Sequence, residues 1–219
     1  MGGRVSQSSF VRQPLPRVVA GYNRMARWYR LGEPAILLPP GMRRKAVRRL
    51  GLKPGDTVLE VGCGTGRNLA LLADAVGAGG VVIGVDATPG MLAQAQRLVA
   101  RRGWPNVRLQ NRDAKELELD RPADAVLFSY SYSVLPEREP VLDKAWEALR
   151  PGGRLVVVDA GLPANRVGRL LTPIGEALAK VFPGDPYSRP WDDLARLARP
   201  VETERFLLDI HFICAISKT

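Results

Sequence analysis

A glycine-rich turn between a predicted strand and a predicted helix constrains the fold of this chain more than any other feature. The turn lies in residues 58–68, and an apolar run of strand length, residues 56–61, leads into it. The apolar residues that follow at helical spacing predict a helix: Leu69, Leu72, Ala73 and Val76. Glycines at alternate positions let the backbone take tight dihedrals, so a ligand can lie directly on the main chain. Free N–H groups at the helix start favour an anionic group there.

The spacing of the turn argues against two common nucleotide-binding patterns. A dinucleotide fingerprint, G-x-G-x-x-G, would place its third glycine at Arg67, where a long side chain stands. A phosphate-binding loop would continue as Gly-Lys-Ser/Thr, which does not follow here. The order is instead Glu60-x-Gly62-x-Gly64-x-Gly66, with an acid at the end of the strand. A glycine turn that binds nothing is the alternative.

Further strand-length runs end in polar residues. The apolar run 81–85 ends at Asp86, whose carboxylate could accept bidentate hydrogen bonds from ribose hydroxyls. Strand 106–110 leads to Asp113 and Ala114, which could meet an adenine amino group and a ring nitrogen; an exposed loop carboxylate is the alternative. Strand 123–128 leads to residues 129–136, and a fifth strand is expected at 154–159.

Helices are expected between these strands, from Thr88-Pro89 onward and over 137–149. Strands that alternate with helices predict a parallel sheet with right-handed crossovers. Ligands of such sheets bind beyond the carboxyl ends of the strands, and the polar residues above all fall there. We therefore expect one site at that edge of the sheet.

The flanking segments differ from this alternating pattern. Helices are predicted at 17–31 and 41–50, the second with Met42, Ala46, Val47 and Leu50 on one side. Residues 161–200 predict a helix at 166–181, a proline-rich loop and a short helix at 191–197, which we interpret as a lid inserted before a final hairpin at 201–206 and 208–217. We expect a basic helical extension (1–50) and a single main domain (51–219).

The composition is that of a soluble globular protein of 219 residues. No apolar run reaches the roughly 18 residues of a membrane span, and the start of the chain lacks the apolar region of a signal peptide. Cys63 and Cys214 make neither a disulfide framework nor a metal cluster, which favours a reducing, cytoplasmic compartment. No metal site is expected, and a structural role is favoured for His211, the single histidine.

The net charge of +10 resides entirely in residues 1–50, where eleven Arg or Lys residues face one acid, Glu33. A basic segment of this kind could bind to an anionic membrane surface or to a nucleic-acid backbone. A solvated basic face is the plainer alternative. No recognisable RNA-binding module accompanies the charge, so nucleic acid is not the expected partner.

With these motifs in place, residues 52–159 resemble the class I S-adenosylmethionine-dependent methyltransferases. The resemblance implies a Rossmann-like, seven-stranded, mostly parallel sheet with an antiparallel last strand, helices on both faces, and S-adenosylmethionine as the cofactor. It also implies roles for residues at matching positions. The cofactor-binding set comprises Tyr29, Glu60, Gly62, Cys63, Gly64, Gly66, Asp86, Ala87, Met91, Asp113, Ala114 and Ser129, with Ser129 bordering the sulfonium.

Three short segments narrow the resemblance. Residues 27–32, 64–69 and 129–136 are similar to N-methyltransferases that build betaine lipids by trimethylating a diacylglyceryl-homoserine head group. The lid does not follow that family. Ubiquinone and menaquinone C-methyltransferases share the general layout, including a tyrosine-rich first helix. Tyr22 and Tyr29 therefore do not discriminate between the quinone enzymes and the betaine-lipid enzymes.

The chemistry expected is displacement at the sulfonium methyl by an acceptor lone pair, promoted by near-attack positioning. No histidine base lies in the motifs, which suits an amine acceptor better than a phenol or carbon acceptor. Tyr29, Tyr130 and Tyr132 could face the sulfonium and a methylated ammonium through cation–π contacts, with Tyr130 and Tyr132 on one face. Ordinary packing is the alternative for these tyrosines.

The leading hypothesis is therefore N-methylation of the amine head group of a lipid, a phospholipid or betaine-lipid precursor. The basic extension would dock the enzyme peripherally on the anionic inner membrane. A soluble quinone or natural-product methyltransferase is the alternative, and an RNA-methylating protein is a third reading.

Overall fold

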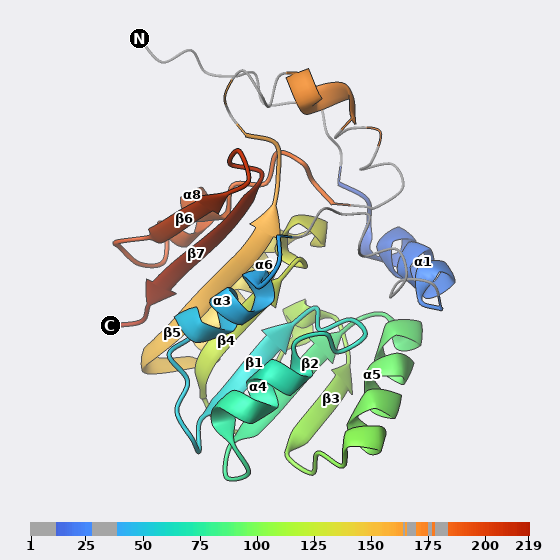
Figure 1. The fold of residues 1–219 in the computed structure, drawn as a ribbon, viewed down its shortest axis with the longest axis vertical. Coiled ribbons are helices and arrows are strands. Elements are labelled where there is room, and N and C mark those ends of the chain that lie inside the picture. Colours follow the sequence, from blue (N-terminus) through green and yellow to red (C-terminus); the bar gives the residue numbers. More distant parts are fainter. Residues whose placement is uncertain (1–11, 28–38, 164, 166–169, 175–176, 178–183) are drawn as a thin grey trace.

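The computed structural model describes residues 12–27, 39–163, 165, 170–174, 177 and 184–219. At its centre lies a seven-stranded sheet of order β3-β2-β1-β4-β5-β7-β6 (Figure 1). The strands are β1 (Thr57–Val61), β2 (Val81–Asp86), β3 (Val107–Asn111), β4 (Ala123–Ser129), β5 (Leu149–Ala160), β6 (Glu202–Phe206) and β7 (His211–Ser217).

The direction of the strands confirms the predicted fold class. β1 pairs in parallel with β2 and β4, and the neighbours β2–β3 and β4–β5 are parallel as well. β7, the last strand of the chain, lies antiparallel between β5 and β6. From β1 the chain adds β2 and β3 on one side and then places β4 on the other side of β1. The segments that leave β1 and β4 therefore run in opposite directions. Open α/β sheets bind ligands at such a switch point, beyond the carboxyl ends of the strands.

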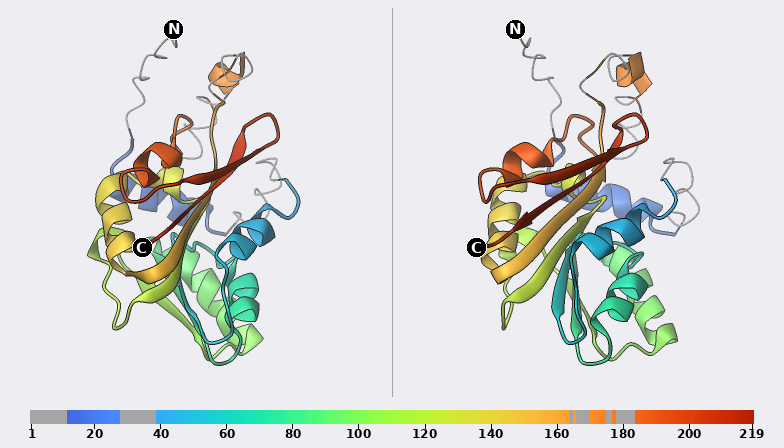
Figure 2. Two further views of the ribbon diagram at one scale, coloured as in Figure 1. Left: turned by 90° about the vertical axis from the view of Figure 1, so that its left-hand side faces the viewer. Right: turned by 60° about the vertical axis from the view of Figure 1, so that its left-hand side comes forward.

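Helices cover both faces of the sheet (Figures 1 and 2). One face packs against α3, α4 and α5, and the other packs against α6 and α8. The bounds are α1 (Leu15–Met25), α3 (Met42–Arg49), α4 (Leu69–Val76), α5 (Pro89–Arg102), η2 (Ala114–Glu116), η3 (Tyr132–Val134), α6 (Arg138–Glu147) and α8 (Pro190–Leu194).

Helix α3 shows why the basic front of the chain folds as it does. Met42, Ala46 and Val47 are buried in the same apolar cluster as the sheet, while Arg44 and Arg48 are exposed. The apolar side of this amphipathic helix therefore covers the sheet, as globular amphipathic helices do. In the described part of the chain, no helix combines the length and the apolar character needed to cross a bilayer.

Several element boundaries differ from the sequence-based expectation. The helix predicted at 17–31 is α1, which begins two residues earlier and ends at Met25; the final residues of the prediction lie outside the described ranges. Of the helix predicted at 166–181, residues 170–174 and 177 are helical and the rest lies outside them. β5 begins at Leu149, because the expected turn at 150–153 continues the strand through an irregular register with β4.

Candidate functional site

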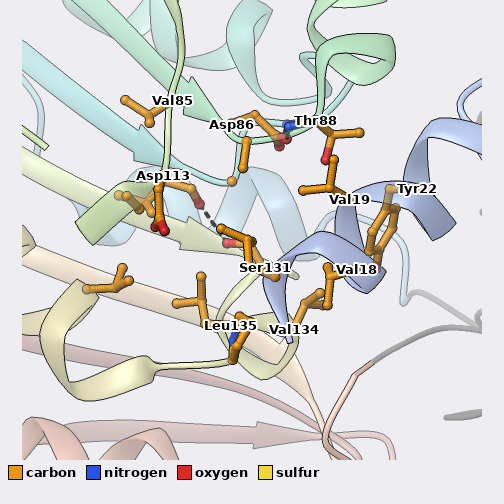
Figure 3. Close-up of a pocket in the computed structure, with 18 of the residues that line it drawn as sticks. Val18, Val19, Tyr22, Val85, Asp86, Thr88, Asp113, Ser131, Val134 and Leu135 are labelled. Carbon is orange, nitrogen blue, oxygen red and sulfur yellow. Dashed lines mark hydrogen bonds between the residues drawn. The ribbon is translucent and has the colours of Figure 1, made fainter. Parts of the chain in front are cut away.

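A pocket opens at the carboxyl edge of the sheet (Figure 3). The space between its walls, counted together with the part of its mouth open to solvent, is about 880 Å³. Its lining comes from the segments that follow β1, β2, β3 and β4 and from α1. The expected site edge is thus hollowed, and α1 forms one of its walls.

The glycine turn contributes main chain rather than side chains to this pocket. Gly62 has a φ of 72°, and a Cβ placed on it would lie 2.5 Å from the Cβ of Ser131. Gly64 has a φ of 55°, and its Cβ position faces open space. The first glycine is required by close packing, and the second leaves a backbone cradle that a side chain would begin to fill.

Asp86 ties the turn to the end of β2. Its Oδ2 accepts a hydrogen bond from the Gly64 N–H at 2.8 Å, and its Oδ1 accepts one from the Thr88 N–H at 2.8 Å. Burial raises the pKa of Asp86, and these two donors oppose that rise. Because each carboxylate oxygen can accept a second bond, Asp86 can still receive hydroxyl donors from a ligand.

Asp113, the N-cap residue of η2, lines the same pocket as Asp86. Its Oδ1 accepts a hydrogen bond from the Lys115 N–H at 3.0 Å, which fixes the first turn of η2 and orients Ala114 toward the same pocket. Asp86 and Asp113 therefore make the polar side of the site.

Glu60 lies beneath the turn, 1% exposed. Its Oε1 accepts from the Asn68 side chain, while its Oε2 has no hydrogen-bond partner. Burial raises the pKa of Glu60 to about 7, against the opposing effect of Asn68 and of the nearby Arg43 charge. The Arg43 guanidinium also donates to the hydroxyl of Ser129 at 3.0 Å, so a buried polar network supports the turn from below.

Tyr130 lies in the pocket wall in a strained conformation. Its φ is 54°, in the left-handed region that bulky residues rarely adopt, and its N–H donates to the Val158 carbonyl at 2.8 Å. The Arg43 guanidinium lies 5.1 Å from the centre of its ring. The Tyr130 hydroxyl lies 3.3 Å from Nδ1 of His211, a residue of β7 that is 1% exposed. Strain of this kind often marks functional positions.

The structure brings most of the predicted site residues together and leaves others out. Those that line the pocket are Gly62, Gly64, Asp86, Ala87, Met91, Asp113, Ala114 and Tyr130. Those that lie outside its lining are Glu60, Cys63, Gly66, Ser129 and Tyr132. Tyr29 lies outside the described residues.

Tyr132 does not share a face with Tyr130, contrary to the expectation. It is fully buried, its hydroxyl donates to Asp193 at 2.8 Å, and its ring meets Phe128 edge-on with centroids 5.5 Å apart. Burial raises the pKa of Tyr132. The left-handed turn at Tyr130 redirects the chain, so Tyr132 enters the cluster under α6 and α8 while Tyr130 packs toward α3.

Because of the same turn, a different serine from the expected one borders the pocket. Ser129 hydrogen-bonds to Arg43 and is buried, whereas Ser131 lines the pocket and donates to the Val61 carbonyl at 2.6 Å (Figure 3). We therefore assign the border of the site to Ser131 in place of Ser129.

Helix α1 supplies the wall that sequence reasoning missed. Leu15, Val18, Val19 and Tyr22 line the pocket, and Figure 3 shows Val18, Val19 and Tyr22 pointing into it from α1. Asn23 of α1 accepts a hydrogen bond from the Gly90 N–H at the start of α5 at 2.8 Å, which seats the helix there. The described residues of 161–200, expected to form a lid, contribute none of the lining. Helical spacing in the sequence predicts α1 but not its place.

The residues present fit S-adenosylmethionine, the cofactor that the resemblance implies. Gly62 and Gly64 offer a bare backbone, Asp86 an acceptor for a diol, and Glu60 a buried oxygen without a partner. The described residues contain no group of His, Cys, Asp and Glu able to hold a metal ion.

Comparison with known proteins gives consistent relatives. The profile of a family described as "Methyltransferase domain" matches residues 58–153. The chain is 30% identical to a demethylmenaquinone methyltransferase of Lactobacillus johnsonii, over 76% of this chain and 66% of the relative. It is 37% identical to the aklanonic acid methyltransferase DauC of a Streptomyces species, over 52% of this chain and 51% of the relative. It is also 37% identical to the arsenite methyltransferase of Halobacterium salinarum, over 49% of this chain and 28% of the relative. The chain thus spans from about a quarter to just under two thirds of these relatives.

Solved structures show the same fold. A SAM-dependent methyltransferase from Aquifex aeolicus superposes with a TM-score of 0.58 at 20% identity, covering 84% of this chain and 96% of that one. Phosphoethanolamine N-methyltransferase 2 from Haemonchus contortus, solved with S-adenosylmethionine, has a TM-score of 0.69 at 16% identity, covering 82% of this chain and 52% of that one.

Replacing Asp86 tests the cofactor assignment. Asp86→Ala should weaken S-adenosylmethionine binding by about 1.5–3 kcal/mol, because charged hydrogen bonds to hydroxyls are lost. Isothermal titration calorimetry measures this, with Asp74→Ala on the exposed face of α4 as the matched control. Unchanged affinity in Asp86→Ala would contradict the assignment.

Proposed function

We propose that this chain is a class I S-adenosylmethionine-dependent methyltransferase whose acceptor is a lipophilic small molecule with an ionisable oxygen or carbon nucleophile. Quinols and polyketide-type phenols are acceptors of this kind. The contact between Tyr130, which lines the pocket, and the buried His211, which does not, carries the proposal.

The shape and polarity of the pocket support a lipophilic acceptor. Its polar groups gather around Asp86 and Asp113, where the nucleoside of the cofactor would be held. The facing walls, from α1 and from residues 134–136, are largely apolar (Figure 3). Burial of apolar acceptor surface against these walls would contribute about 25 cal/mol per Å².

The Tyr130–His211 pair supports an acceptor that must lose a proton. S-adenosylmethionine supplies the methyl group as an electrophile. A phenol or carbon acid attacks efficiently only once its proton has gone to a positioned base. The Tyr130 hydroxyl can accept that proton while passing its own to Nδ1 of His211, 3.3 Å away. The sequence places no histidine near the motifs, and β7 brings His211 there in the fold.

Two of the relatives carry names consistent with this acceptor class. The printed names refer to demethylmenaquinone and aklanonic acid, and the first relative aligns with three quarters of this chain. These names support the proposal, and the matched family profile covers the glycine turn and the strand ends that form the pocket.

N-methylation of a lipid amine at an anionic membrane is the second candidate. The rings of Tyr22 and Tyr130 line the pocket, and a methylated ammonium would gain about 0.5–2 kcal/mol from each cation–π contact. Arg44 and Arg48 of α3 are exposed and could meet anionic lipid. Lys45 and Arg49, however, pair with Glu204 and Glu202 of β6, which reduces the charge that α3 offers to a membrane.

An acceptor panel separates the two candidates. We expect labelled methyl transfer from S-adenosylmethionine to reduced menaquinone-type and polyketide phenols in detergent, with a rate that rises with pH as the acceptor ionises. Phosphatidylethanolamine in vesicles with and without anionic lipid is the comparison. Transfer to the amine lipid alone, dependent on anionic lipid and on low salt, would replace the proposal with the second candidate.

A further inference from the structure

A second groove lies behind the glycine turn, apart from the pocket described above. It runs between the start of α4 and the length of α5. Its lining includes four arginines, Arg67, Arg97, Arg101 and Arg102, and no acidic residue. Gly62 and Gly64 face the first pocket while Thr65 and Gly66 face this groove, so one turn separates the two.

The arginines of α5 lie along one side of the groove. Along α5, Gln94, Arg97, Leu98 and Arg101 follow the spacing of a single helix face, and all of them line the groove. Arg101 and Arg102 lie in the last turn, where cations favour the helix dipole. That effect accounts for neither Arg97 nor Arg67.

The three arginines of α5 are also uncompensated within the described chain. Arg97, Arg101 and Arg102 are exposed and make no ion pair with any described residue, whereas Lys45 and Arg49 on α3 are paired. Like charges gathered in a concave site repel one another and concentrate counter-anions there. The groove therefore favours an anion that meets several guanidinium groups at once.

Two further groups complete the groove. Thr65 is 6% exposed, and its hydroxyl has no hydrogen-bond partner. A buried hydroxyl of this kind usually finds a partner, so a donor remains for a ligand. Trp104 also lines the groove, and its ring is a flat apolar surface.

We propose that this groove binds two or more linked phosphoryl groups of a small molecule. Guanidinium groups bind phosphate oxygens through paired hydrogen bonds, and Arg97 and Arg101 lie one helical turn apart, about 6 Å along the axis. That separation suits a chain of phosphoryl groups better than a single charge. The site is concave, so a flat lipid surface does not enter it. The phosphoryl groups belong to free pyrophosphate or to a nucleotide whose base stacks on Trp104.

Calorimetry with the full chain tests the site, with pyrophosphate and ATP as separate titrants at constant ionic strength. Arg97→Gln combined with Arg101→Gln should weaken binding by about tenfold or more, because two charge-assisted contacts are lost. Arg121→Gln combined with Arg199→Gln removes the same charge from exposed positions outside the groove and should change the affinity less than about twofold. Circular dichroism checks that both variants fold. Tighter binding of ATP that is lost in Trp104→Ala would assign the nucleotide.

Three results would overturn the proposal. The first is no binding of either titrant. The second is an equal loss in both double variants, which would mean that net charge alone attracts the anion. The third is displacement of pyrophosphate by S-adenosylhomocysteine, which would place it in the first pocket. A gel shift with generic RNA that occurs without pyrophosphate binding counts as the first result. None of these measurements needs a methyl acceptor, so their outcome is independent of whether the proposed methyl transfer is correct.

Discussion

Tyr130→Phe is expected to lower kcat for a phenol or carbon acceptor by about 100-fold, while S-adenosylmethionine affinity changes less than about twofold. The variant keeps the ring under Arg43 and the left-handed backbone, and it removes only the hydroxyl that contacts His211. General base catalysis typically contributes about 10²–10⁴-fold, so the effect should appear in kcat rather than in binding. Stopped assays over a range of pH, paired with calorimetry, separate the two quantities.

Tyr132→Phe is the matched control for this experiment. It removes a tyrosine hydroxyl two residues away that hydrogen-bonds to Asp193 outside the pocket. It should cost about 1 kcal/mol of stability and leave kcat unchanged. If Tyr130→Phe also leaves kcat unchanged with every phenol that turns over, the proposed base is wrong. A change below about threefold with an amine lipid would instead agree with the second candidate, since an amine can arrive deprotonated.

Arg138→Met is expected to lower the free energy of unfolding by about 3–5 kcal/mol. The Arg138 side chain is 5% exposed, and its Nη2 lies 2.9 Å from Oδ2 of Asp185. The same guanidinium donates to the carbonyls of Tyr132 and Ser133, so it joins α6, η3 and the segment before α8. Arg138→Met removes the buried cation next to Asp185, whose other ion-pair partner, Arg12, is 44% exposed and lies farther away, at 3.6 Å; this accounts for the size of the effect. Urea unfolding followed by tryptophan fluorescence measures it.

A second helix position and a double variant complete that test. Lys144→Met breaks the exposed pair between Lys144 and Glu147 on the same helix and should cost less than about 1 kcal/mol. Arg138→Met combined with Asp185→Leu should recover much of the loss, because the one charge that then loses its partner, on Arg12, is 44% exposed rather than buried. Equal stabilities of Arg138→Met and Lys144→Met would show that the buried pair contributes no more than an exposed one.

The sequence predicts the sheet and the polar half of the site because both depend on local pattern. Apolar runs that end in a glycine turn or an acid identify β1 and β2, and alternation with helices identifies parallel strands. Asp86 and Asp113 follow from their positions at strand ends, and both line the pocket. The antiparallel β7 was expected from the family resemblance and is present.

The rest of the site, namely the region around Tyr130 and the wall formed by α1, depends on contacts between distant segments. The Tyr130–His211 contact joins residues 81 positions apart and exists only because β7 inserts next to β5. The left-handed φ of Tyr130 has no sequence signal, since glycine is the usual residue there, and the exchange of Ser129 for Ser131 follows from it. The position of α1 depends on the contact of Asn23 with α5, which helical periodicity does not encode.

Helix α3 has a consequence for anyone who shortens or recharges this protein. Its inner side chains lie in one cluster with Val58 of β1 and Val156 of β5. Its Arg43 donates a hydrogen bond to the Asn68 side chain, in the polar network under the glycine turn. A chain begun at residue 51 would expose a strip of bare sheet to water, which invites aggregation. Its cationic outer side and its apolar inner side occupy the same two turns, so surface charge and solubility cannot be engineered here independently of each other.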